Sequence, residues 1–300
     1  MIPFSIRHLE VFVAVATTGT VKAAAESLFI TQPAASMALA ELERQIEAPL
    51  FDRLRGKMQL TPKGKELLPQ AQEILERLQE LQHRALSDHA ALRGELHIGT
   101  SNTVGNYLIG DLLDGFVKQH PLVSLHVDVA NTEVIVRALL EHKSDVICVE
   151  GPVHHPELES RIWREDSLYV CAAANHPLAL RKTLTRDDFA GVNWIMREHG
   201  SASRALTELA IAELPSGNIL LELGQVEAIK QATMAGWGIS CLPKAATIDA
   251  VKAGRLVLLD TPFMNLKRYL SLAIHRSRYQ GHVLNAFLQQ LGWDDAKPSA

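Results

Sequence analysis

The chain has 300 residues, 47% of them hydrophobic, and its 30 basic and 34 acidic side chains give a net charge of −4. This size and composition allow two or three folded domains and exclude a wholly disordered chain. No apolar run reaches the roughly 18 residues that a membrane span needs, and the start, MIPFSIRHLE, lacks the pattern of a secretory signal. We therefore expect a cytoplasmic protein with no membrane partner.

The first elements are three helices. Apolar residues from Leu9 to Ala16 have helical spacing, and Gly19-Thr20 ends that helix. A short alanine-rich helix follows at about 21–28, and "TQP" then begins a third, with Thr31 as its cap and Pro33 in its first turn. The last two form a helix-turn-helix at about Val21 to Ala40.

The third helix has the chemistry of a reader of the DNA major groove. Its first turns, TQPAASMALA, carry no charge but offer hydroxyls, an amide and methyl groups. Gln32 could bond adenine through two hydrogen bonds, Thr31 and Ser36 could reach bases or phosphates, and Pro33 could touch a thymine methyl. The other side of the helix, with Ala35, Leu39, Leu42 and Ile46, is predicted to be buried.

A hairpin is predicted next, with strands at about 50–54 and 58–60 and a turn between them. Five basic residues follow one another here without an acid: Arg53, Arg55, Lys57, Lys63 and Lys65. Such a strip can hold DNA phosphates even on an acidic protein. A merely solvated loop explains the charges equally well.

Thr61-Pro62 begins a long linker helix at 63–92. Apolar residues repeat along it at alternating intervals of four and three: Leu67, Ala71, Ile74, Leu78, Leu81, Ala85 and Leu92. This short heptad seam favours dimerisation over packing against the chain's own body. Pro69 predicts a kink or a late start of the helix.

Strands and helices alternate through residues 93–300, which predicts an α/β domain with largely parallel strands. One lobe, at about 93–164 and 268–300, is interrupted by a second at about 165–267. The two connecting segments would form a hinge and a cleft.

The candidate cleft residues lie in turns where a strand passes into a helix. GTSNTVGN supplies Thr100, Ser101, Asn102 and Thr103, and MREHGSASR supplies Arg197, Gly200 and Ser201. Two helix starts and an arginine would suit a small oxyanion such as sulfite, sulfate or a carboxylate. Plain helix capping also explains the hydroxyls. Arg197 could equally pair with Glu150 or Glu198, and Glu150 could close the cleft or orient a ligand.

The sequence favours neither a metal nor another cofactor. Cys148, Cys171 and Cys241 sit in apolar runs, so we expect buried thiols in a reducing compartment. The adjacent His154 and His155 cannot face one ion from a helix, so no metal site is expected. No nucleophile elbow, dinucleotide fingerprint or phosphate-binding loop is present, so we expect neither catalytic residues nor an enzyme. A solute-binding protein would explain the two lobes but not the first ninety residues.

The N-terminal residues HLEVFVAVATTGTVKAAAESLFITQPAASMALAELERQIEAPLFDR…LTPKG resemble the winged helix-turn-helix of LysR-type transcriptional regulators. The resemblance extends over the whole chain and implies a two-lobed effector domain like the type 2 periplasmic binding proteins. It implies a dimer or tetramer that binds promoter DNA at an inverted repeat of T-N11-A character, and a small molecule in the cleft that changes DNA bending and the contact with RNA polymerase.

The resemblance assigns DNA contacts to Thr31, Gln32, Pro33 and Ser36 and to the wing residues Arg53 and Arg55. Two departures matter: the glycine usual in this family's LGxxLF segment is taken to be Ala48 here, and no basic residue follows shortly after the serine. SNTVGNYL, EGPVHHPEL, REHGSASR and VEAIKQATMAGWGISCLP resemble the CysL/YeiE subgroup, which is linked to sulfur assimilation and the sulfite response. An organic carboxylate is the alternative effector.

Overall fold

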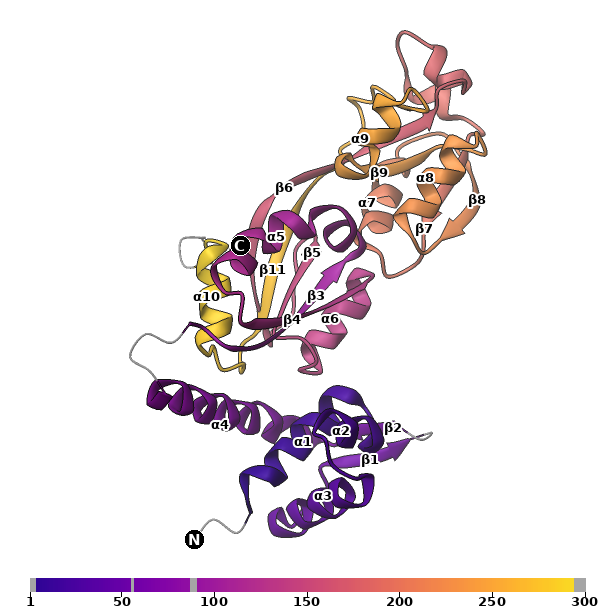
Figure 1. The fold of residues 1–300 in the computed structure, drawn as a ribbon. Helices are drawn as coiled ribbons and strands as arrows, with labels where there is room; N and C mark the ends of the chain where they lie inside the picture. Colours follow the sequence, from indigo (N-terminus) through magenta and orange to yellow (C-terminus); the bar gives the residue numbers. More distant parts are fainter. Residues whose placement is uncertain (1–3, 55–56, 87–90, 294–300) are drawn as a thin grey trace.

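The computed structural model describes residues 4–54, 57–86 and 91–293. An N-terminal helical unit, a long helix and a two-lobed α/β domain follow one another along the chain (Figure 1). Within these described residues, no helix is both long enough and apolar enough to cross a membrane.

The N-terminal unit is a winged helix-turn-helix, as predicted. Helices α1 (Ile6–Thr18), α2 (Val21–Ser27) and α3 (Gln32–Ile46) pack on one another, and strands β1 (Phe51–Leu54) and β2 (Lys57–Leu60) form an antiparallel hairpin. The Thr20 and Thr31 hydroxyls cap α2 and α3 by accepting hydrogen bonds from Ala23 N (3.2 Å) and Ala34 N (3.4 Å). Phe12 and Phe51 meet edge to face in the core, with ring centroids 5.6 Å apart.

The end of α3 corrects the position of the missing glycine. Glu47, not Ala48, has the left-handed backbone there, with φ of +58°. Glycine is favoured at a left-handed position just past a helix, because in that conformation the Cβ of any other residue comes too close to the backbone. The departure from the family pattern therefore lies at Glu47.

Helix α4 (Pro62–Leu86) follows the hairpin directly. The Thr61 hydroxyl donates to Pro49 O (2.8 Å) and accepts from Gly64 N (3.0 Å), which ties the helix start to the wing. Gly64 is required by this close approach, since a Cβ there would lie 2.2 Å from Leu50 O. Pro69 lies inside the helix, so the expected late start is wrong.

The predicted seam divides along α4. Leu67 and Ala71 pack against the core of the N-terminal unit, whereas Ile74 and Leu81 are exposed. Leu92 lies beyond the helix and packs against the core of the first lobe, so it does not belong to the seam. The seam available to a partner is therefore shorter than the sequence predicts.

The first lobe, lobe I, is built on three parallel strands. β3 (Gly94–Ser101) lies between β4 (Val123–Ala130) and β5 (Val146–Glu150). Helices α5 (Ile109–Gln119), α6 (Thr132–Leu140) and α10 (His282–Gln290) cover the sheet. Its core includes Phe116 and Phe287, which meet edge to face at 5.3 Å.

Lobe II is the inserted block. Its elements are β7 (Asn193–Arg197), α7 (Ala202–Ile211), β8 (Asn218–Leu223), α8 (Val226–Met234), β9 (Ser240–Pro243), α9 (Lys244–Lys252) and β10 (Leu256–Leu258), with short 3₁₀ turns at Pro177–Leu180 and Arg186–Phe189. β7 and β8 are parallel. Two apolar clusters, one around Phe189 and Trp194 and one around Ile195 and Ile229, form its core.

Two strands join the lobes. β6 (Leu158–Ala173, 16 residues) pairs with β11 (Lys267–His275) in lobe I and with β9 and β10 in lobe II. All four of these strand pairs, counting β11 with β5, are antiparallel, so the expectation of largely parallel strands holds only away from the crossing. The sheet order is β10-β6-β11-β5-β3-β4, with β9 also on β6. The register of β6 against β11 shifts between Leu270 and Ser271.

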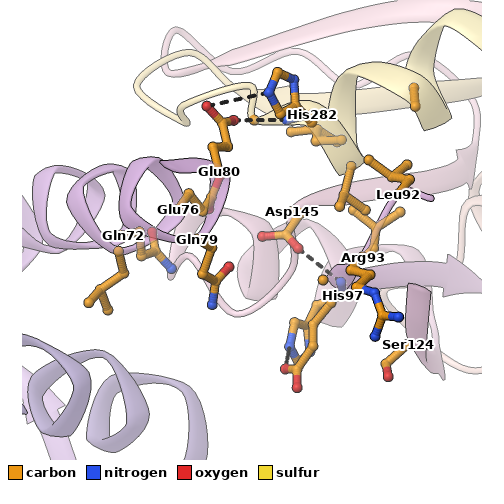
Figure 2. Close-up of a pocket in the computed structure, with 18 of the residues that line it drawn as sticks. Gln72, Glu76, Gln79, Glu80, Leu92, Arg93, His97, Ser124, Asp145 and His282 are labelled. Atoms are coloured by element: carbon orange, nitrogen blue, oxygen red, sulfur yellow. Dashed lines mark hydrogen bonds and ion pairs between the residues drawn. The ribbon is translucent and has the colours of Figure 1, made fainter. Parts of the chain in front are cut away.

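Helix α4 contacts lobe I through a cluster of charges beside a cavity of about 810 Å³ (Figure 2). Arg278 donates to Asp145 Oδ1 from Nε (3.0 Å) and Nη2 (2.9 Å) and also pairs with Glu76 of α4. Burial raises the pKa of Glu76 to about 7, although Arg278 opposes the shift. Two carboxylates thus share one guanidinium at this junction.

The backbone at Glu47 generates a stability prediction. Glu47→Gly should raise the free energy of unfolding by about 0.5–1 kcal/mol, because glycine adopts the left-handed conformation without steric cost. Denaturant titration of the full chain, followed by circular dichroism, measures it. Ala48→Gly is the matched control and should give no gain. An equal gain at both positions would contradict the assignment.

Candidate functional site

The exposed side of α3 carries three of the predicted DNA contacts. Thr31, Gln32 and Pro33 are exposed at its start, and Ser36 is half-buried one turn later. Ala35, Leu39 and Leu42 are buried on the opposite side, as predicted, and Ile46 is half-buried against the same core. The Thr31 hydroxyl already accepts the capping hydrogen bond, so it has one lone pair and its own proton left for a further partner.

Met37 is a surface residue that the sequence reasoning did not select. Its side chain is 73% exposed and lies four residues after Pro33, so both occupy one face of the helix. An exposed methionine beside an exposed proline supplies apolar surface of the kind that touches thymine methyl groups. The sequence could have indicated Met37 through its position four residues after Pro33, which places both on the same face of the helix.

The basic residues predicted to hold DNA phosphates differ in their surroundings. Arg53 lies opposite Met58 in the hairpin, and both Arg53 and Lys57 are exposed. Arg55 lies outside the described residues. Lys63 forms an ion pair with Glu66 at 3.0 Å, so part of the predicted strip is neutralised by its own helix.

A carboxylate of α3 braces the base of the wing. Glu43 Oε1 accepts hydrogen bonds from Leu50 N (2.7 Å) and Phe51 N (3.2 Å). Met58 N donates to Gly19 O (2.9 Å) at the start of the helix-turn-helix. Because the hairpin is fixed to the helix in this way, α3 and the wing form one surface.

On the lobe I side of the interlobe site, the chain turns from β3 into a helix at Asn102. The turn widens into a π-helical segment, Val104–Leu108, before α5. Ser101, Asn102 and Thr103 are buried here. Thr100 differs from expectation: its hydroxyl donates to Asp128 O (3.4 Å) on the neighbouring strand, so it is engaged within lobe I.

On the lobe II side, Arg197 ends β7, and Ser201 caps α7 by accepting from Arg204 N (3.5 Å). The Arg197 guanidinium is buried and binds the adjacent Glu198 through two hydrogen bonds, Nε to Oε2 (2.7 Å) and Nη2 to Oε1 (2.8 Å). This contact settles the alternatives for Arg197 in favour of Glu198 over Glu150.

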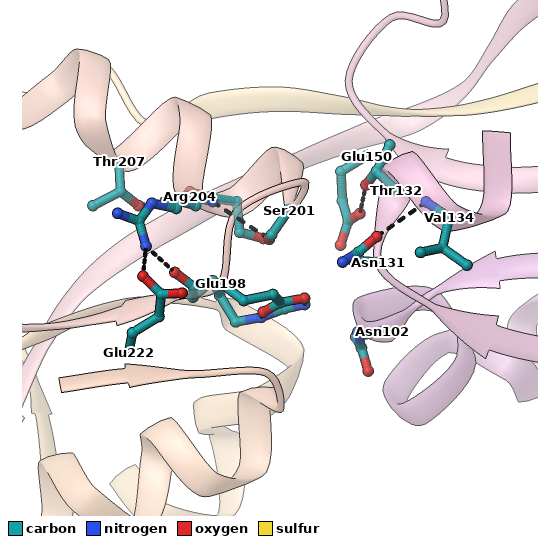
Figure 3. Close-up of polar contacts among 12 residues, drawn as sticks. Asn102, Asn131, Thr132, Val134, Glu150, Glu198, Ser201, Arg204, Thr207 and Glu222 are labelled. Atoms are coloured by element: carbon teal, nitrogen blue, oxygen red, sulfur yellow. Dashed lines mark hydrogen bonds and ion pairs between the residues drawn. The ribbon is translucent and has the colours of Figure 1, made fainter. Parts of the chain in front are cut away.

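Side chains of the two lobes face each other at this site, with Glu198 and Ser201 on one side and Asn102 and Asn131 on the other (Figure 3). Glu133 N, on α6, donates to Gly200 O (3.1 Å) on the lobe II side. Gly200 has φ of +84°, a left-handed conformation that favours glycine, and a Cβ there would lie 2.7 Å from Glu133 Oε2, so the end of that side chain would have to move. Tyr107 OH adds a second bridge by donating to Glu227 Oε2 (3.1 Å) on α8.

Arg268 is the central residue that the sequence reasoning missed. Its Nε donates to Asp166 Oδ2 (2.7 Å) and its Nη1 to Ser203 Oγ (2.8 Å) on α7. On the lobe I side, Nη2 donates to Thr103 Oγ1 (3.4 Å), and Nη1 lies 3.8 Å from Glu150 Oε1. One guanidinium therefore joins both lobes from the crossing strand β11.

A signal for Arg268 was present in the sequence. It lies two residues before Leu270 in an apolar strand, and alternate residues of a strand face the same side. A cation on the buried side of a strand needs a buried anion. The sequence could not reveal that Glu150 and Asp166 are those anions.

Glu150 is ionised although it is fully buried. Burial alone would raise its pKa, but the Arg268 guanidinium and a hydrogen bond from Thr103 hold the pKa below its ordinary value of 4.5. Thr132 Oγ1 also donates to Glu150 Oε2 (3.3 Å). The Ser101 hydroxyl is buried without a hydrogen bond of good geometry, yet it lies near enough to lower the same pKa.

The three cysteines are buried, as expected. Burial raises the pKa of all three thiols, that of Cys241 to about 12. None is therefore a thiolate at neutral pH, which is the form needed for thiol chemistry.

Comparison with known proteins gives a consistent match over the chain. Residues 6–65 match the bacterial regulatory helix-turn-helix protein family of lysR type, and residues 89–293 match the LysR substrate binding domain. YeiE, an uncharacterised HTH-type transcriptional regulator of Escherichia coli K12, is 35% identical over 285 residues, which cover 95% of this chain and 96% of that protein.

Solved structures share the architecture. A full-length single-residue variant of OxyR from Pseudomonas aeruginosa matches with a TM-score of 0.74 at 21% identity, covering 99% of this chain and 98% of that one. The CcmR regulatory domain of Synechocystis PCC6803, in complex with 2-PG, matches with a TM-score of 0.61 at 27% identity, covering 66% of this chain and 96% of that one.

The buried guanidinium predicts a pH-dependent loss of stability. Arg268→Gln should lower the free energy of unfolding by about 3–5 kcal/mol at pH 7, since it leaves buried carboxylates unpaired. The wild-type chain should lose stability as the pH falls below the ordinary pKa of 4.5, because the pKa of Glu150 is lower in the folded state. In the variant, burial raises that pKa, so the deficit should shrink on acidification.

Denaturant titrations at pH 7, pH 5 and pH 4 measure both effects. Arg255→Gln is the matched control, because Arg255 is exposed in lobe II. A deficit of equal size at pH 7 and pH 5 would show that Arg268 does not balance a buried carboxylate.

Proposed function

This chain belongs to the LysR family of bacterial helix-turn-helix regulators, and we propose that it binds promoter DNA under the control of a small anion held between its two lobes. The DNA-binding part rests on the uncharged start of α3 lying exposed beside a basic wing. The same proposal makes the chain a regulator rather than an enzyme, and it places the chain in the cytoplasm, where it meets RNA polymerase at the promoter.

On DNA, the chain binds as a dimer, and the α3 helix of each copy enters the major groove at one half of an inverted repeat. Gln32, Ser36 and Thr31 read base edges or bind phosphates, and Pro33 and Met37 contact thymine methyls. Arg53, Arg55 and Lys57 hold the sugar-phosphate backbone. With Lys63 of α4 paired to Glu66, fewer charges of the basic strip are free to reach phosphate than the sequence alone predicts.

Between the lobes, the observation that carries the proposal is the pairing of Arg197 with Glu198. A buried guanidinium that is paired with the next residue along the chain can exchange that carboxylate for a free anion. Glu198 retains 24% exposure of its side chain, so it can leave toward solvent. The helix start at Ser201 adds backbone donors to the same anion.

Ser101, Asn102 and Thr103 complete the site from lobe I. Glu150 orients the site through its contact with Arg268. It does not itself touch an anion, because it carries a negative charge. Gly200 keeps the lobes close enough for a small ligand to touch both. Thr100 has no part in this site, because its hydroxyl is directed to β4.

Sulfite, or another metabolite of sulfur assimilation, is the first effector to test, because the cleft segments resemble the CysL/YeiE subgroup. An organic anion such as a carboxylate is the second candidate. It is favoured by the CcmR domain, a structural neighbour that binds the small organic ligand 2-PG. Both fit a guanidinium that forms two parallel hydrogen bonds.

Self-association follows from α4. Ile74 and Leu81 are exposed on a helix whose neighbouring positions already pack within the chain. Exposed apolar residues seven apart form a seam that a second α4 can cover. We therefore include a second copy of the chain among the partners, as a dimer or a tetramer.

Two variants test the DNA surface: one should change the discrimination between DNA sequences, and the other should change the affinity for all DNA. Gln32→Ala should reduce discrimination between a preferred and an unrelated duplex by about 1–3 kcal/mol, since it removes a base contact. Arg53→Ala should weaken binding to both duplexes alike and flatten the salt dependence by about one phosphate contact. Fluorescence anisotropy at several salt concentrations, with a duplex selected from a random pool, measures both.

The two variants fail in different ways if the surface is wrong. If Gln32→Ala weakens binding equally on all DNA, α3 does not read bases. If Arg53→Ala leaves the salt slope unchanged, the wing does not contact phosphate.

The effector site is tested by a second pair. Arg197→Lys should weaken anion binding roughly tenfold or more, because lysine cannot form the two parallel hydrogen bonds. Glu198→Gln should tighten binding, because it removes the carboxylate that competes for Arg197. Calorimetric titration with sulfite, and in parallel with small organic carboxylates, measures the affinities, and DNA binding without effector should persist in both variants.

The direction of the Glu198→Gln effect decides the mechanism. Weaker anion binding in that variant would mean that Glu198 belongs to the ligand site and does not compete with the ligand.

A further inference from the structure

Three side chains outside the DNA and effector surfaces meet on one face of the lobe I sheet. Glu95 and His97 are on β3, and His126 is on the neighbouring strand β4. One ligand atom from each lies within 4.8 Å of those of the other two. His97 Nε2 is 3.8 Å from Glu95 Oε2, and the two imidazole rings are stacked with centroids 4.7 Å apart.

The strand register places these residues together. β3 and β4 are parallel, with His97 paired to His126 and Glu95 paired to Ser124. Side chains at paired positions, and at positions two apart on one strand, share a face. The convergence is therefore a property of the backbone and does not depend on a mobile loop.

The backbone of His97 is held from the other side as well. His97 N donates to Asp145 Oδ2 (2.9 Å), and Asp145 N donates to His97 O (2.8 Å). Asp145 is in turn fixed by Arg278 through two hydrogen bonds. Figure 2 shows Asp145 beside His97 at the wall of the cavity that faces α4.

Two imidazoles and a carboxylate form a ligand set suited to zinc and to neighbouring first-row divalent metals. In a tetrahedral zinc site the metal-ligand distances are about 2.0–2.2 Å, so neighbouring ligand atoms lie roughly 3.4 Å apart. The pair of His97 and Glu95 is already near this spacing. The two rings are now stacked nearly parallel, so both must turn for their lone pairs to converge on one ion, and the broad terminal torsion of histidine permits such a turn.

The accessibility of the three residues suits an ion that enters from solvent. Glu95 and His126 are exposed, and His97 is half-buried. Three protein ligands leave a position for water or for another donor at the same cavity. The three thiols, which would otherwise compete for zinc, are buried in the two lobes.

We propose that Glu95, His97 and His126 form a binding site for a divalent transition-metal ion of the zinc type, on the lobe I face that meets the linker helix. The site is separate from the interlobe cleft, because its ligands lie at the start of β3 and midway along β4, whereas the cleft lies at the end of β3. A bound ion joins two strands directly beside the junction with α4.

The test is a calorimetric titration of the full chain, without a histidine tag and freed of metal, with Zn²⁺ alone. The wild-type chain should bind one ion per chain, and its thermal midpoint should rise with the logarithm of the free Zn²⁺ concentration. His126→Ala and Glu95→Gln should each lower the affinity by about tenfold or more, because even outer-shell changes at metal sites cost 10–100-fold.

His154→Ala is the matched control, since it removes an exposed histidine that lies outside the cluster. It should bind Zn²⁺ as the wild-type chain does. His126 and Glu95 are exposed, so their variants should unfold at the wild-type temperature when metal is absent, and this measurement separates loss of the site from loss of the fold. Absence of saturable binding by the wild-type chain, or wild-type affinity in both ligand variants, would overturn the proposal.

Discussion

The Arg268 guanidinium pairs with the buried Glu150 and the half-buried Asp166, and among the described residues it forms the most extensive polar contact between the lobes. Glu150 and Asp166 would be costly to bury as ions without a cation, and Arg268 would be equally costly without them. The same group reaches Ser203 on α7 and Thr103 at the turn after β3. The arrangement of the two lobes is therefore partly electrostatic, because one guanidinium contacts groups of both lobes.

Much of the fold could be predicted from local patterns. Thr20 and Thr31 cap helices where the sequence indicates caps, and the buried side of α3 follows from the spacing of Ala35, Leu39 and Leu42. The alternation of strands and helices indicated the two lobes and the crossing strands. These features depend on residues close together in the chain, and propensity and periodicity describe such neighbours well.

The remaining features depend on register and on contacts between distant segments. Thr100 and Ser101 are adjacent, yet the pleat of β3 directs them to opposite faces, and only Ser101 lies near Glu150. Arg268 and Glu150 are 118 residues apart and meet because β11 pairs with β5. The grouping of His97 with His126 requires the register of two parallel strands, whereas a search for metal sites along the sequence compares only near neighbours such as His154 and His155.

The two connections between the lobes are themselves strands, and both take part in one continuous ladder. Flexible loops would allow a large rotation of one lobe relative to the other. Hydrogen-bonded strands such as β6 and β11 resist bending and deform mainly by twisting. The regular pairing of the ladder is interrupted where its register shifts, between Leu270 and Ser271, two residues from Arg268. We therefore expect a relative movement of the lobes to twist lobe I, and α4 would follow that twist because Glu76 is paired with Arg278.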